Sequence, residues 1–66
     1  MKWLTLGTRP KFIEDIKKWF ADNSIQYSET IVESDGIARV FYRPIGKAQK
    51  DKCIEYITYR CYNNLL

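Results

Sequence analysis

The stretch ESDGIARVFYR, residues 33 to 43, decides the fold because it joins a turn signal to a strand of alternating character. Asp35 and Gly36 match the pair preferred in a two-residue type I′ hairpin turn. The flanking segments, Ile25 to Glu33 and Ile37 to Ile45, are rich in β-branched and aromatic residues. The sequence therefore predicts a β-hairpin centred on this turn.

The register of the hairpin follows from the length of its loop. A two-residue loop pairs Ile31 with Val40, and Ala38 and Tyr42 then share the face of Val40. This face is the more apolar one and is expected to meet the helices. The opposite face carries Arg39, Phe41 and Arg43. A slip of one residue would exchange the two faces.

The segments around the hairpin predict one further strand and two helices. Residues 2 to 6 read as a short strand that ends at Gly7, and Thr8 is the expected N-cap of the first helix. The apolar stripe of that helix consists of Phe12, Ile13, Ile16, Trp19 and Phe20. A last helix is expected from about Lys47 to the C-terminus, with a buried stripe of Ile54, Ile57, Cys61 and Leu65.

The predicted fold is an α+β two-layer sandwich in a single domain, residues 1–66. A chain of 66 residues has too little surface to enclose a second core. The expected order is strand, helix, strand, strand, helix, in a three-stranded antiparallel or mixed sheet. With a right-handed first crossover, the third strand lies between the other two and both helices cover one face. The other face of the sheet is then bare.

Composition excludes several classes of function. The chain has no histidine and no closely spaced cysteine pair, so we expect no metal site, no cofactor and no enzyme activity. Cys53 and Cys61 are separated by about 12 Å along a helix, too far for a disulfide, which indicates reduced thiols. No apolar run resembles a signal peptide or a membrane span, so we expect a cytoplasmic protein with no membrane partner.

The bare sheet face is the first candidate site. Trp3 extends it, and no carboxylate is predicted opposite Arg39 or Arg43. Rings beside unpaired cations are typical of surfaces that bind single-stranded nucleic acid. The expected contacts are Trp3, Arg39, Phe41 and Arg43, with Lys47, Lys50 and Lys52 at the start of the last helix. In the alternative interpretation, the rings pack under the arginine stems and all these cations are simply solvated.

The second candidate site is a row of tyrosines on the last helix. Tyr56, Tyr59 and Tyr62 recur every three residues and are expected to point away from the buried stripe. Such a row favours a protein contact, as in a small regulator or inhibitor of the kind that viruses and mobile elements encode. A homodimer through this row or through a sheet edge is a further option. The alternative is that so small a domain leaves some rings uncovered.

Overall fold

The central strand of the sheet comes from residues 33–43, the segment with the turn signal and the alternating strand. The computed structural model describes residues 2–28 and 31–66. Strand β4 (Ala38–Arg43) lies between β1 (Leu4–Thr8) and two short strands on its other edge, β2 (Gln26–Tyr27) and β3 (Ile31–Val32). All the described pairings are antiparallel. The predicted central position of the third strand is confirmed, and the predicted second strand is present as β2 and β3, with residues 29–30 outside the described part.

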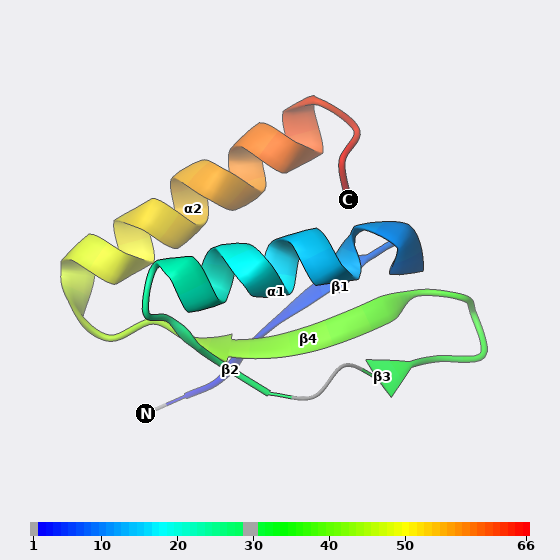
Figure 1. Ribbon diagram of the computed structural model, residues 1–66, viewed down its shortest axis with the longest axis horizontal. Coiled ribbons are helices and arrows are strands. Elements are labelled where there is room, and N and C mark those ends of the chain that lie inside the picture. The colour runs from blue at the N-terminus through cyan, green and yellow to red at the C-terminus, as the bar shows by residue number, and fades with distance from the viewer. Residues whose placement is uncertain (1, 29–30) are drawn as a thin grey trace.

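The helices form the second layer. A short 3₁₀ turn, η1 (Pro10–Phe12), leads into α1 (Ile13–Asp22), and α2 (Gly46–Tyr62) follows the sheet. Figure 1 shows α1 and α2 on the same side of the sheet, which confirms the α+β sandwich layout. Within residues 2–28 and 31–66, no helix has the length and apolar character needed to cross a membrane.

The core lies between α1 and the sheet and is joined by one side chain from α2. Its buried members are Leu6, Ile13, Ile16, Phe20, Ile25, Ala38, Val40, Tyr42 and Cys53. Phe20 stands at its centre, with its ring centroid 5.0 Å from that of Tyr42 and 6.0 Å from that of Tyr27. Of the predicted apolar stripe of the first helix, Ile13, Ile16 and Phe20 are buried in the core, and Phe12 and Trp19 are partly buried against it.

The start of the first helix differs from the prediction. β1 continues through Gly7 to Thr8, because Gly7 pairs with Arg39 and Thr8 pairs with Ala38. Thr8 is buried in this strand and does not cap the helix; Arg9 holds the N-cap position of η1 instead. The hydroxyl of Thr8 is buried without a hydrogen-bond partner among the described residues.

Next to the turn, the hairpin register also differs from the prediction, by one residue. The Gly36 amide donates to the Glu33 carbonyl at 3.0 Å, and the Glu33 amide donates to the Ile37 carbonyl at 3.1 Å. Gly36 has a φ of 79°, so the loop contains three residues with a left-handed glycine, not two. Ile31 consequently pairs with Arg39, not with Val40. Ile31 therefore belongs to the face away from the helices, where it is 48% exposed.

The buried side of α2 is not the predicted stripe. Cys53 and Arg60 are its buried residues, and Ile57 packs partly against the core. Ile54 and Cys61, which the prediction placed inside, are exposed. The cause is that α2 carries apolar residues on more than one side, so spacing alone does not identify the face that meets the core.

The chain turns back after α2 and closes over the end of the core. Asn64 has a φ of 57°, and Leu66 packs against the core cluster. Arg9 Nε donates to the Leu66 carbonyl at 2.6 Å, and Arg60 Nε donates to the Leu65 carbonyl at 2.9 Å. Both arginines therefore hold the C-terminal segment through its backbone.

Candidate nucleic-acid interface

The sheet face away from the helices carries the predicted aromatic and basic residues. Alternate residues of β4 point to opposite faces, and Ala38, Val40 and Tyr42 are buried under the helices. Arg39, Phe41 and Arg43 therefore share the opposite face and are partly exposed. Thr5 of β1 pairs with Phe41, and Trp3, two residues earlier on the same face, is 41% exposed. The predicted placement of Trp3, Arg39, Phe41 and Arg43 on one face agrees with the structure.

Arg39 is not the free cation that the sequence predicted. Its Nη2 lies 3.0 Å from Oδ2 of Asp35, in a hydrogen-bonded ion pair. The Arg39 guanidinium lowers the pKa of the Asp35 carboxyl, and the hydrogen bond from the Ile37 amide adds to this effect. The prediction considered only acids directly across the strand, whereas this acid comes from the turn that leads into β4. Arg39 therefore contributes little free positive charge to the face.

Arg43 instead forms a cation–π pair with Trp3. The guanidinium carbon lies 5.2 Å from the centroid of the Trp3 ring. Among the described residues, no carboxylate lies within ion-pair distance of Arg43, and its buried Nε has no hydrogen-bond acceptor. The Trp3–Arg43 pair thus keeps its positive charge beside a partly exposed ring, with Phe41 two residues away along the same face.

Each of the three lysines predicted to bind nucleic acid has a different neighbour or hollow beside it. Lys47 Nζ lies 3.6 Å from the Asp51 carboxylate, within the same helix. Lys52 lines a groove of about 320 Å³ between α1 and α2. Lys50 lines a small hollow at the end of the sheet together with Lys2. Of the three lysines, Lys50 is the one that shares a hollow with residues at the end of the sheet.

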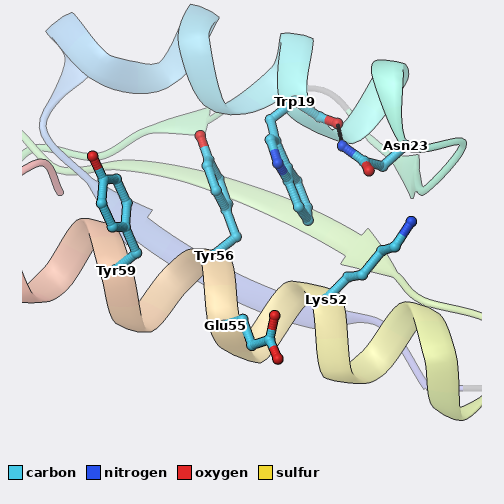
Figure 2. A pocket seen from close by; sticks show the side chains of 6 residues that line it. All are labelled: Trp19, Asn23, Lys52, Glu55, Tyr56 and Tyr59. Atoms are coloured by element: carbon cyan, nitrogen blue, oxygen red, sulfur yellow. Dashed lines mark hydrogen bonds between the residues drawn. The ribbon is translucent and has the colours of Figure 1, made fainter.

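The three predicted tyrosines also separate. The ring of Tyr56 stacks on Trp19 with a centroid distance of 4.0 Å and an interplanar angle of 2°, and its hydroxyl accepts a hydrogen bond from Arg60 Nη1 at 3.1 Å. Figure 2 shows these two rings side by side between the helices, with Tyr59 next in the row. Tyr56 is therefore part of the fold, whereas Tyr59 and Tyr62 are exposed.

The outward side of α2 forms an apolar surface. Ile54, Tyr59 and Tyr62 are 63%, 59% and 88% exposed. They border a shallow hollow of about 570 Å³ that Glu55, Thr58 and Asn63 complete. We call the six residues that line this hollow the outer α2 surface. Its apolar character matches the protein-contact alternative, although Ile54 replaces the predicted Tyr56.

The sequence did not predict the roles of two basic residues, Lys2 and Arg60. The place of Lys2 beside the hollow at the sheet end could not be predicted from the residue itself, because it depends on the pairing of β1 with β4. Arg60 was hidden in the last helix, where an arginine is ordinarily solvated; it is buried over Phe12, with its guanidinium carbon 5.3 Å from the ring centroid.

Two titratable groups of the core have pKa values shifted by burial. Burial raises the pKa of the Cys53 thiol and of the Tyr42 hydroxyl, so both remain protonated at neutral pH. Within the part of the chain that the structure describes, no group of three or more histidine, cysteine, aspartate or glutamate residues is placed to hold a metal ion.

Comparisons with protein-family models, with curated proteins and with solved structures give no match to this chain. Its function is therefore inferred from its own residues.

Proposed function

We propose that this protein is a non-catalytic module that binds single-stranded nucleic acid on the uncovered face of its sheet. The observation that carries the proposal is the Trp3–Arg43 pair, in which a partly exposed indole ring lies beside a guanidinium group without a described carboxylate partner. Phe41 extends the apolar part of the same face. Single-stranded bases stack on such rings and on guanidinium planes, while their phosphates attract the cation.

The small positive net charge of the molecule is consistent with weak binding to single-stranded nucleic acid. The net charge is +3, which attracts a polyanion without the strong field of a basic tail. Because Asp35 neutralises Arg39, the positive charge of the face is concentrated at Arg43. We therefore expect binding that tolerates many sequences and that weakens steeply with salt.

The test is fluorescence anisotropy with a labelled oligonucleotide of mixed sequence, measured across a salt series. Stacking of one base contributes about 1 to 3 kcal/mol, so Trp3→Ala should weaken binding by roughly 5-fold to 150-fold. Tyr62→Ala is the matched control, because it removes an exposed ring from α2. Absence of binding by the wild-type protein at low salt, or equal affinities of the two variants, would contradict the proposal.

The outer α2 surface supports a second candidate function, which is contact with a protein, as in a small regulator or inhibitor. Its three large residues, Ile54, Tyr59 and Tyr62, are exposed on neighbouring turns of one helix, and aromatic residues are enriched at the centres of protein interfaces. A second copy of the chain is one partner of this class.

The two functions predict opposite responses to the same variants. For a protein contact, Ile54→Asp and Tyr59→Ala should abolish capture of a stoichiometric partner from nuclease-treated extract, whereas Trp3→Ala should leave it unchanged. Sedimentation of the purified protein tests the second copy directly. A monomer that captures no protein would leave the outer α2 surface without a role in binding.

For the site of action, we propose the cytoplasm. Cys53 and Cys61 are both free thiols, as is usual for proteins of a reducing compartment. Retention of two free thiols in the protein purified from its native cell is the expected result, and an intermolecular disulfide there would contradict it.

A further inference from the structure

A small hollow lies at the end of the sheet farthest from the hairpin turn. Its volume is about 180 Å³, and it is lined by Lys2, Leu4, Pro44 and Lys50. These residues come from three separate segments: the first residue of β1 with the residues just before it, the residue after β4, and an early turn of α2. We call it the two-lysine hollow. Its lining combines two apolar residues with two lysines.

The lysines of the hollow have no acid beside them. No carboxylate lines it, and among the described residues neither Lys2 nor Lys50 has an ion pair. The nearest acid along α2, Asp51, pairs with Lys47. Two cations that border the same hollow repel one another. An anion bound between them attracts both, so its binding is electrostatically favourable. The hollow is therefore suited to a small anionic group.

The hollow also adjoins the proposed stacking pair. Lys2 precedes Trp3 in the chain, and Pro44 follows Arg43. Side chains alternate between the faces of a strand, so the hollow lies on the helix side of the sheet end and the Trp3–Arg43 pair lies on the other side. A single strand that stacks a base on Trp3 needs to pass only around the end of β1 to bring a backbone phosphate to the hollow.

We propose that the two-lysine hollow binds one phosphate of the nucleic acid whose neighbouring base stacks on the Trp3–Arg43 pair. This inference rests on the proposed function. Lysine ammonium groups bind phosphate as point charges and need no particular ring geometry, which suits a shallow site of this kind. The inference also assigns different roles to the predicted lysines: Lys50 contacts the ligand, and Lys52, in the groove between the helices, does not.

The test compares Lys50→Gln and the double variant Lys2→Gln/Lys50→Gln with Lys52→Gln as the matched control. Glutamine keeps a long polar side chain and removes the charge. Loss of one phosphate contact should reduce the slope of log affinity against log salt by about 0.7 for a single strand. Lys52→Gln should leave the slope at the wild-type value, and Lys50→Arg should restore it.

A second measurement separates this inference from the proposed function. Inorganic phosphate is titrated while the amide resonances of Leu4 and Lys50 are followed by NMR. If oligonucleotide binding depends on Trp3 but is the same in the double glutamine variant as in the wild type, the hollow does not bind a phosphate, and the proposed function is unaffected. If no oligonucleotide binds but phosphate shifts these resonances, and the shift is lost in Lys50→Gln, the hollow is an anion site and the proposed function is wrong. If neither ligand binds, both are overturned.

Discussion

Truncation of Tyr56 and truncation of Tyr59 should have very different effects on stability. The two residues are three positions apart on α2 and have the same side chain, so composition cannot distinguish the variants. Tyr56 stacks on Trp19 at 4.0 Å and accepts a hydrogen bond from Arg60, whereas Tyr59 is mostly exposed. Figure 2 shows that Tyr56 is the ring next to Trp19.

The magnitude follows from the two contacts of Tyr56. A stacked aromatic pair contributes about 0.5 to 1.5 kcal/mol, and a hydrogen bond to a charged group about 1.5 to 3 kcal/mol. We therefore expect Tyr56→Ala to lower the free energy of unfolding by about 2 to 4 kcal/mol. Tyr59→Ala should change it by less than about 0.5 kcal/mol, as is usual at the surface. A chain of this length has a total stability of only about 3 to 10 kcal/mol.

The assay is thermal and urea unfolding of both variants, followed by circular dichroism. The midpoint of Tyr56→Ala should fall by roughly 10 to 30 °C, given about 4 to 8 °C per kcal/mol in a domain of this size. Tyr56→Phe isolates the hydroxyl, because it keeps the ring and removes only the acceptor of the buried Arg60. Equal losses for Tyr56→Ala and Tyr59→Ala would refute the position of α2 against α1.

Three further predictions concern other parts of the fold. A thiol reagent should label Cys61 rapidly in the native protein and Cys53 only on unfolding, since Cys53 is buried and burial raises its pKa; equal rates would contradict the orientation of α2. Asp35→Asn should tighten oligonucleotide binding and steepen its salt dependence, because it frees Arg39. In the wild type the ion pair contributes stability above the unfolded-state pKa of Asp35, and this stability is lost as pH falls through the lowered folded-state pKa. The free energy of unfolding should therefore fall less on acidification in the variant than in the wild type, and an equal fall would contradict the pair. Gly36→Ala should lower the unfolding midpoint, since φ is 79° there and a left-handed alanine costs about 1 to 2 kcal/mol; an unchanged midpoint would contradict the loop conformation.

The faces of β4 were predictable, whereas the register of its partner was not. Alternation over Ala38 to Arg43 is a property of one strand, and burial of Val40 between two neighbours leaves no choice of face. The pairing of Ile31 depends instead on whether the turn contains two residues or three. The sequence Asp-Gly is compatible with both loops, because the left-handed glycine occurs in either. The side chain of Ile31 therefore lies on the face opposite to the predicted one.

The orientation of α2 was less predictable than that of α1. In α1 the apolar residues lie on one side and charges on the other, so its buried face is evident. In α2, Ile54 is exposed whereas Ile57 packs partly against the core, although the two residues are only three positions apart. The orientation of the helix matches the stacking of Tyr56 on Trp19 of α1. That contact joins residues distant in sequence. The spacing of apolar residues within α2 therefore could not predict which side of the helix is buried.

Arg39 and Arg43 provide the final test, because they are the same residue type on the same face of one strand, four positions apart. Arg39 lies at the turn end, where Asp35 pairs with it and Glu33 adds a second negative charge that raises its pKa. Arg43 lies at the other end, beside Trp3 and near the two-lysine hollow. A polyanion should therefore prefer the Arg43 end of the face.

Arg43→Ala should reduce the slope of log affinity against log salt by about 0.7, since one phosphate contact is lost. Arg39→Ala should leave the slope near its wild-type value, because Arg39 is paired with Asp35 and contributes no phosphate contact. Both variants are compared in the same oligonucleotide assay, after circular dichroism shows that each remains folded. Equal effects of the two substitutions would mean that the ion pair at Asp35 does not hold Arg39 in solution, and that the ligand contacts the whole length of β4.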